Sequence, residues 1–162
     1  MFNLLDNSSN KIAIIDEDGS ELSYNFLKSK ILDFKKLFQS RGLVFLDADN
    51  DFFSLSVYCA CLELNLPIAL IDNFQTLNDD KSLINSYLPK YIFTKKELIH
   101  ESYEKQDNSD NYNMYVYIKK LISLSNKISL LISTSGTLSN KKFVILSKKN
   151  LITNTDQIID YL

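Results

Sequence analysis

The chain has 162 residues, of which 45% are hydrophobic and 23% are charged, a balance typical of a folded globular domain and not of a disordered chain. Its 18 basic and 20 acidic side chains give a formal net charge of −2, so it lacks the basic excess that binding to a nucleic-acid backbone requires. No stretch approaches the roughly 20 apolar residues that span a bilayer, and the N-terminus lacks the basic and apolar regions of a signal peptide.

The first 65 residues alternate short apolar strands with longer helices. Residues 11–24 predict two strands around the turn signal Asp18-Gly19, and Ser23 is positioned to cap a helix that runs to about Gln39 and is terminated by Gly42. The apolar side chains at near-helical spacing in this helix are Phe26, Leu27, Leu32, Phe34, Leu37 and Phe38. Residues 43–48 predict a strand. A second helix over 49–65 is expected to face inward through Phe52, Phe53, Leu55, Val57 and Leu62.

The rest of the chain continues this alternation. Further strands are expected at 67–72, 91–94, 114–118, 127–134 and 141–147, and a short helix at 80–88. The segment 101–113 is polar and rich in turn residues, which predicts a surface loop. Ser147 is expected to cap a last helix that carries apolar side chains to the end of the sequence.

Strands and helices in this order predict an α/β fold with a mostly parallel, doubly wound sheet and flanking helices. The last helix reaches the final residue without a cap while still carrying Ile158, Ile159 and Leu162. We interpret this ending as a cut within a larger protein, and we expect the apolar side chains exposed there to be covered by self-association.

The two cysteines and the single histidine offer little material for metal or nucleophilic chemistry. Cys59 and Cys61 are separated by one residue, which matches no zinc-ligand pair. Two buried thiols in a reducing cytoplasm are therefore expected. Because His100 is the only histidine, His-based dyads and His-rich metal sites are disfavoured. The sequence predicts neither metal ligands nor catalytic residues.

The segment 133–142, Ser-Thr-Ser-Gly-Thr-Leu-Ser-Asn-Lys-Lys, joins two expected strands and is rich in hydroxyl groups. Such a turn can direct backbone N–H groups and hydroxyls at phosphate oxygens, with a lysine as a point charge. It is not a Walker A loop, because the second glycine and the Lys-Ser/Thr pair are missing. On its own, a segment of this composition is more often a solvated hairpin turn.

Residues 134–151, TSGTLSNKKFVILSKKNL, resemble the phosphate-binding signature of the acyl-adenylate-forming superfamily, which includes acyl-CoA synthetases, peptide-synthetase adenylation domains and luciferases. Its pattern is roughly Thr-Ser-Gly-Ser/Thr-Thr-Gly-x-Pro-Lys-Gly-Val, then an apolar pair, Ser/Thr-His, any residue and Asn-Leu. The positions that match without gaps are Thr134, Ser135, Gly136, Thr137, Lys142, Val144, Leu146, Ser147, Asn150 and Leu151. Segments 21–27, 47–72 and 90–94 also resemble upstream parts of the family, in the same order.

The loop departs from the family pattern at several positions. Leu138 and Ser139 stand where the family usually has threonine and glycine, Lys141 replaces proline, Phe143 replaces glycine and Lys148 replaces histidine. Loss of one glycine and one proline changes loop flexibility and how closely the backbone approaches phosphate. The added charge of Lys141 partly compensates.

The resemblance implies the N-terminal part of an AMP-binding (adenylation) domain over residues 1–162, in an enzyme that uses ATP and Mg²⁺ to activate a carboxylate as an acyl-adenylate. The phosphate-binding set it implies is Thr134, Ser135, Gly136, Thr137, Ser139 and Lys142. The family's adenine, acyl and catalytic-lysine segments lie downstream of such a region, so the chain alone is expected to be inactive and to need the remainder of the enzyme as its partner. The acid that it activates stays open.

Two other interpretations remain. The altered loop and the short length are also typical of a non-catalytic, stand-alone interaction module derived from the same fold. The strand and helix pattern alone also fits a flavodoxin-like or other nucleotide-binding α/β domain.

Overall fold

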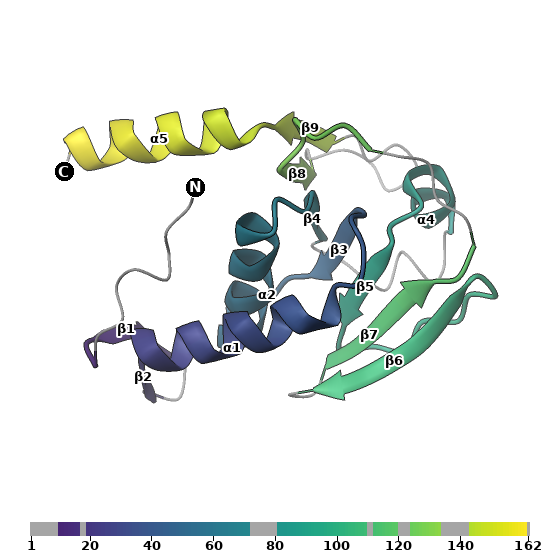
Figure 1. The fold of residues 1–162 in the computed structure, drawn as a ribbon, viewed down its shortest axis with the longest axis horizontal. Coiled ribbons are helices and arrows are strands. Elements are labelled where there is room, and N and C mark those ends of the chain that lie inside the picture. The colour runs from purple at the N-terminus through teal and green to yellow at the C-terminus, as the bar shows by residue number, and fades with distance from the viewer. Residues whose placement is uncertain are drawn as a thin grey trace.

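In the computed structural model, the residues described are 10–16, 19–71, 81–109, 112–119, 124–133 and 143–161. The elements in chain order are β1 (Ile12–Ile15), β2 (Glu21–Ser23), α1 (Tyr24–Leu37), β3 (Val44–Asp47), α2 (Phe52–Glu63), β4 (Ile68–Ile71), α4 (Ser82–Tyr87), β5 (Tyr91–Thr94), β6 (Tyr103–Ser109), β7 (Tyr112–Tyr117), β8 (Leu130–Ser133), β9 (Phe143–Leu146) and α5 (Lys148–Tyr161) (Figure 1). The α/β class expected from the sequence is confirmed.

The described strands form one seven-stranded sheet in the order β6-β7-β5-β3-β4-β8-β9, and a separate hairpin of β1 and β2. The central strands β5, β3, β4 and β8 are parallel, whereas β7, β6 and β9 are added antiparallel at the two edges. The expected parallel arrangement is found for the four central strands, but the antiparallel outer strands make the sheet as a whole mixed. The consecutive pairs β6–β7 and β8–β9 are joined by connections shorter than the dozen or so residues that a crossover between parallel strands needs.

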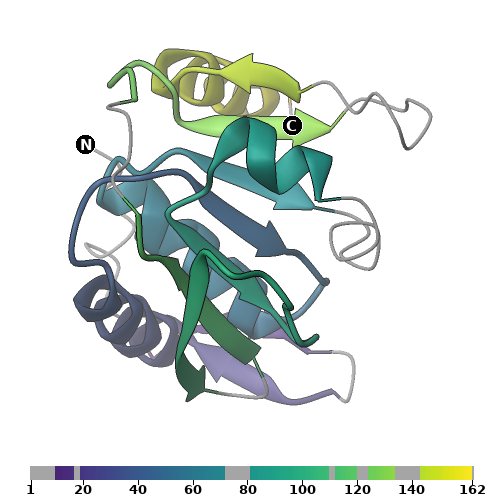
Figure 2. The ribbon, with the colours of Figure 1, turned by 90° about the vertical axis from the view of Figure 1, so that its right-hand side faces the viewer.

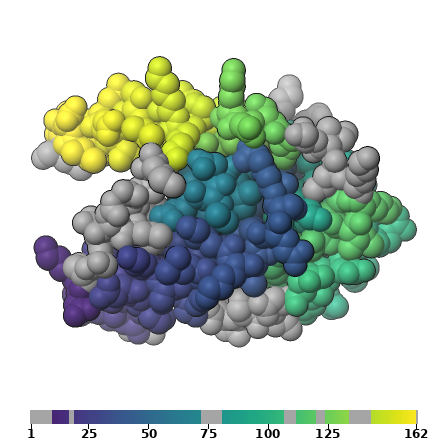
Figure 3. Space-filling model, in the orientation of Figure 1, coloured from purple at the N-terminus to yellow at the C-terminus, as the bar shows by residue number. Residues whose placement is uncertain are grey.

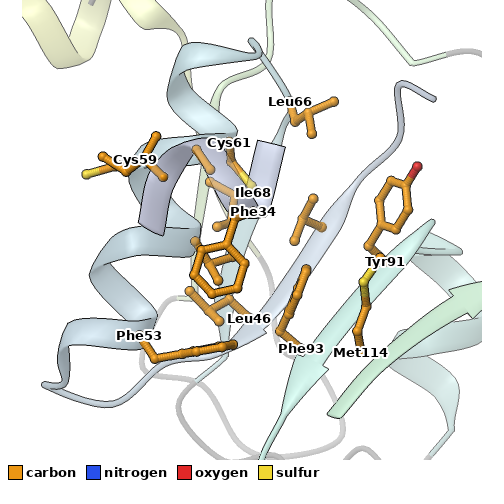
Figure 4. Close-up of a cluster of buried hydrophobic side chains, with 14 of the residues drawn as sticks. Phe34, Leu46, Phe53, Cys59, Cys61, Leu66, Ile68, Tyr91, Phe93 and Met114 are labelled. Carbon is orange, nitrogen blue, oxygen red and sulfur yellow. The ribbon is translucent and has the colours of Figure 1, made fainter. Parts of the chain in front are cut away.

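Helices lie against both faces of the sheet. A cluster of buried side chains joins α1 and α2 to β3, β4 and β5 through residues such as Phe34, Phe53 and Phe93 (Figure 4). A second cluster on the opposite face includes Ile84 of α4 together with Phe45 and Ile92. Figure 2 shows α4 on the side of the sheet away from α1 and α2. The central strands therefore lie between a layer formed by α1 and α2 and a layer formed by α4.

Local capping signals account for where several helices begin. The Ser23 side chain accepts a hydrogen bond from Phe26 N at 3.3 Å, and the Asp51 side chain accepts one from Ser54 N at 2.8 Å. At α5, Asn150 N donates to Ser147 Oγ while Ser147 N donates to Asn150 Oδ1, at 3.2 and 2.9 Å. This reciprocal pair satisfies N–H groups that a helix start leaves without partners. The predicted caps at Ser23 and Ser147 are confirmed.

The end and the inner face of α1 differ from the expectation. The helix ends at Leu37, before Gly42, and it buries Leu27, Ile31 and Phe34 while Phe26 and Leu32 remain 42% and 41% exposed. A Cβ atom at Gly42 would collide with the Lys90 side chain. Glycine is therefore required at this position by the close approach of another segment and not by the end of the helix.

The second helix also begins and faces differently from the prediction. Its first residue is Phe52 and not Asp49, because Asp51 caps it. Phe53, Val57 and Leu62 are buried as expected, but Leu55 is 37% exposed. The helix buries polar and small side chains too, among them Ser54, Ser56 and Ala60.

The expected surface loop at 101–113 is wrong for most of its length. Tyr103–Ser109 forms β6, which pairs antiparallel with β7 at one edge of the sheet. Glu104, Lys105 and Gln106 are exposed on it. An edge strand pairs with a neighbouring strand on one side only and is open to solvent on the other, so a polar sequence can adopt this conformation without an alternating apolar pattern.

Cys59 and Cys61 are free thiols and both are buried, as predicted. Burial raises the pKa of Cys59 to about 11 and also raises that of Cys61, so neither is a reactive thiolate at neutral pH. No helix among the described residues is long and apolar enough to cross a bilayer.

Candidate functional site

The predicted phosphate loop begins and ends at the side of the sheet where the central parallel strands have their carboxyl ends. Ser133 at the end of β8 pairs with Phe143 at the start of β9, so the connection between them leaves the sheet and returns at the same place. The parallel strands β3, β4 and β5 end at this edge too. In open α/β sheets, ligands bind outside the carboxyl ends of the strands. The residues of the predicted set, Thr134, Ser135, Gly136, Thr137, Ser139 and Lys142, themselves lie outside the described residues.

A charged cluster that was not predicted from the sequence lies along the same edge, where β3 and β5 end. Lys95 Nζ donates to Asp49 Oδ2 at 2.6 Å and to Asp51 Oδ2 at 2.9 Å. The Lys95 ammonium also lies 5.0 Å from the centre of the Tyr112 ring. These hydrogen bonds hold the pKa of Lys95 above its usual value, so it is a fixed cation and not a candidate base.

A chain of hydrogen bonds connects this cluster to α2. Tyr112 Oη donates to Asp51 Oδ2 at 3.0 Å and lies 3.2 Å from Ser54 Oγ. Since the tyrosine has one proton to donate, the Ser54 hydroxyl donates to Tyr112, and Ser54 Oγ in turn accepts from Asp49 N at 3.0 Å. The Tyr112 ring stacks on Phe53 with centroids 3.6 Å apart. The stack and the hydrogen bonds fix the position of Tyr112.

The pKa values of two carboxylates in this region, Asp51 and Asp47, are shifted in opposite directions. Partial burial raises the pKa of Asp51, but hydrogen bonds from Ser54, Lys95 and Tyr112 outweigh it, and the pKa lies below its usual value. Burial raises the pKa of Asp47, and the 2.8 Å hydrogen bond from Thr94 Oγ1 offsets this only in part. Burial also raises the pKa of Tyr112 to about 12, which keeps its hydroxyl protonated at neutral pH.

A cavity of about 520 Å³ adjoins the cluster, between β1, the ends of β3 and β4, and the start of α2. Its wall is mainly apolar and includes Ile14, Leu46, Leu55 and Tyr58. Carboxylates from three of the residues that line it, Asp16, Asp49 and Asp51, give it an acidic character, and no lysine or arginine is among the lining residues that the structure describes.

Sequence reasoning did not single out this cluster, although its components were visible. Asp47, Asp49 and Asp51 alternate directly after an apolar strand, and Lys95 follows another strand. They lie close together because β3 and β5 are neighbours in the sheet. This pairing cannot be predicted from a local sequence pattern. Among the described residues, no group of three His, Cys, Asp or Glu side chains is arranged to hold a metal ion.

No protein-family model matches the sequence, and no curated protein matches it significantly.

Solved structures do resemble the fold over most of the chain. ATP-bound MatB from Rhodopseudomonas palustris shares 17% identity over 98% of this chain, with a TM-score of 0.68. CmiS6 shares 16% over 95%, with a TM-score of 0.68. A fatty acyl-adenylate ligase from L. pneumophila, solved with acyl adenylate and pyrophosphate, shares 18% over 87%, with a TM-score of 0.58.

The chain therefore has a fold that is found within these three proteins, one of which is a fatty acyl-adenylate ligase. It spans only 36% of the MatB chain, 40% of CmiS6 and 28% of the fatty acyl-adenylate ligase. The fold implied by the resemblance of residues 134–151 to the adenylate-forming signature is confirmed.

Proposed function

We propose that this chain supplies the phosphate-binding part of an ATP-dependent ligase that activates a carboxylate as an acyl-adenylate. The residues proposed to contact the β- and γ-phosphates are Thr134, Ser135, Gly136, Thr137, Ser139 and Lys142. The rest of the site, which places the adenine, the acyl group and the α-phosphate, would come from the remainder of the ligase. The chain alone would then bind the β- and γ-phosphates of ATP but would not catalyse adenylation of the carboxylate with release of pyrophosphate.

The observation that carries this proposal is where segment 134–142 is anchored. Its two ends are the paired residues Ser133 and Phe143 at the carboxyl edge of the sheet, in a fold shared with an ATP-bound protein. Hydroxyls, a glycine and Lys142 are suitable donors for phosphate oxygens. The acidic residues Asp49 and Asp51, which follow β3, would repel a triphosphate, and this favours the β8–β9 side for the phosphates.

Magnesium would enter this site with the nucleotide. Mg²⁺ is commonly held by one or two carboxylates together with substrate phosphates. Nucleotide phosphates and water would then supply most of its ligands.

The first test replaces Lys142 by alanine in the complete ligase. We expect the KM for ATP to rise, or turnover to fall, by about tenfold or more, because a hydrogen bond to a charged group contributes about 1.5–3 kcal/mol. Lys149→Ala is the matched control, since this lysine is exposed on α5. Unchanged kinetics of Lys142→Ala would contradict the phosphate role.

The second test uses the 162-residue chain alone, in carboxylate-dependent ATP–pyrophosphate exchange with fatty, aryl and amino acids. We expect no exchange above background. Placing the reacting groups contributes roughly 7–11 kcal/mol to lowering such a barrier, and this chain would supply only one side of that arrangement. Measurable exchange would show that the chain is a complete catalyst.

A second candidate function is an interaction module without catalysis. It is favoured by the exposed apolar side chains of β9 and α5, among them Val144, Ile145, Ile158 and Ile159. A module of this kind would bind no ATP, and Lys142→Ala would leave its partner binding unchanged. Calorimetric titration of the chain with MgATP separates the two candidates.

A further inference from the structure

The cavity beside Asp49 lies where the order of the strands reverses. From β3 the chain passes through α2 to β4 on one side, and from β4 it passes through α4 to β5 on the other side of β3. The two connections cover opposite faces of the sheet, because α2 and α4 belong to different buried clusters. Neighbouring strands whose connections diverge in this way leave a crevice at their carboxyl ends, where α/β proteins bind ligands.

The dimensions and the wall of the cavity suit a small molecule. Its volume of about 520 Å³ lies within the range of roughly 300–1,000 Å³ that is usual for ligand pockets. The apolar residues that line it come from the sheet (Leu46 and Leu70), from α2 (Leu55 and Tyr58) and from the β1–β2 hairpin (Ile14). A ligand that fills it therefore needs an apolar body.

The acidic residues at the rim of the cavity favour a ligand with a positively charged head group. The lining residues include Asp16, Asp49 and Asp51 and no basic side chain among those described. Lys95 lies beside the rim and pairs with Asp49 and Asp51, so these three groups together carry a formal charge of about −1 at neutral pH. The N-terminus of α2, which would otherwise attract an anion, is already capped by Asp51.

We propose that this cavity binds an amphipathic amine, with its apolar body between α2 and β1 and its ammonium group at the Asp49 side of the rim. Asp49 is the best placed of the three carboxylates, because Asp51 already accepts hydrogen bonds from Ser54, Tyr112 and Lys95. The Asp49 side chain is 57% exposed, and its bond to Lys95 is made through Oδ2. The site is distinct from the proposed phosphate loop and disfavours anions.

Three probes with one apolar tail and different head groups test this proposal: octylamine, octanol and octanoate. They are titrated into the full chain by calorimetry at pH 7 and low ionic strength, without ATP. We expect octylamine to bind about tenfold more tightly than octanol, and octanoate to bind more weakly than octanol. Amide chemical shifts should change around Ile14, Ala48 and Leu55, which line the cavity.

Asp49→Asn is the decisive variant, because it removes one charge from an exposed position and should not disturb folding. We expect it to reduce the affinity for octylamine about tenfold and to leave the affinity for octanol unchanged. Asp33→Asn is the control, since Asp33 is an exposed carboxylate on α1 that is paired with Lys36 and is not among the residues that line the cavity.

Three results would overturn the proposal. Octanoate could bind as tightly as octylamine, no probe could bind below about 1 mM, or Asp33→Asn could have the same effect as Asp49→Asn. Absence of binding would show that the cavity is filled in solution, by this chain or a partner. Because no nucleotide is present, these outcomes are independent of the phosphate loop.

Discussion

The centre of the sheet and its β8–β9–α5 end are built from similar apolar sequences but differ in how they are covered. In β3, Val44, Phe45 and Leu46 are fully buried between helices on both faces. In β9, Val144 and Ile145 are 48% and 56% exposed, and none of the fourteen residues of α5 is buried. Figure 3 shows α5 projecting past the body of the molecule.

This difference shows that an apolar pattern specifies an element but does not specify what covers it. The α5 helix has its cap and an amphipathic sequence, yet Ile152, Ile158 and Ile159 face outward. Its contacts with the body are at its first turns, through Leu151 and through a hydrogen bond from Lys148 Nζ to Asn65 Oδ1. Exposed apolar side chains that lie together on one element are a feature of interaction sites.

The largest difference between the two regions is expected in the free energy of unfolding when isoleucine is replaced by alanine in each of them. Ile68→Ala in β4 removes a fully buried side chain and should lower the free energy of unfolding by about 2–5 kcal/mol. Ile145→Ala in β9 should change it by about 0.5 kcal/mol or less, because that side chain is more than half exposed. Urea denaturation measures both. Equal losses would mean that β9 is covered in solution.

Self-association is the next test of the exposed region. We expect the average mass to rise with protein concentration in sedimentation equilibrium. The double variant Ile158→Lys with Ile159→Lys should weaken association by about tenfold or more, since burying one such side chain contributes about 1.5–3 kcal/mol. Ile12→Lys, at an exposed position of β1, is the control. A wild-type chain that stays monomeric at high concentration would contradict this prediction.

Within the covered region, Tyr112→Phe separates stacking from hydrogen bonding. The ring should stay stacked on Phe53, while the bonds to Asp51 and Ser54 are lost. We expect a loss of about 1–3 kcal/mol in thermal or urea unfolding, because Asp51 is a charged partner. Tyr24→Phe, at a position 37% exposed, should have little effect. Similar losses in both variants would argue against the network.

The smallest expected effect is on the pH dependence of stability. The pKa of Asp51 is lowered in the folded state, so its contribution is present above the ordinary value near 3.8 and is lost as the pH falls through the folded value. Asp51→Asn should therefore reduce the loss of stability on acidification below about pH 4, while asparagine preserves the helix cap. An unchanged acid limb of the stability curve would show that Asp51 is not a source of acid sensitivity.

The elements could be predicted well wherever their signals are local. Ser23 and Ser147 lie three residues from their hydrogen-bond partners, so a short stretch of sequence contains the whole cap. The apolar runs of β3, β4 and β5 likewise predict buried strands from their composition. The β6 strand was missed because its polar sequence becomes a strand only when β7 lies beside it.

The sequence by itself determined the α/β class, most helix and strand positions, the two buried thiols and the similarity of residues 134–151 to a phosphate-binding signature. The tertiary structure alone decided the mixed sheet, the cluster of Lys95 with Asp49 and Asp51, and the cavity beside it. Lys95 is 46 residues from Asp49, and they meet because β5 pairs with β3 and not with β4, which precedes it in sequence. Strand order depends on the packing of the whole chain, and no local pattern contains it.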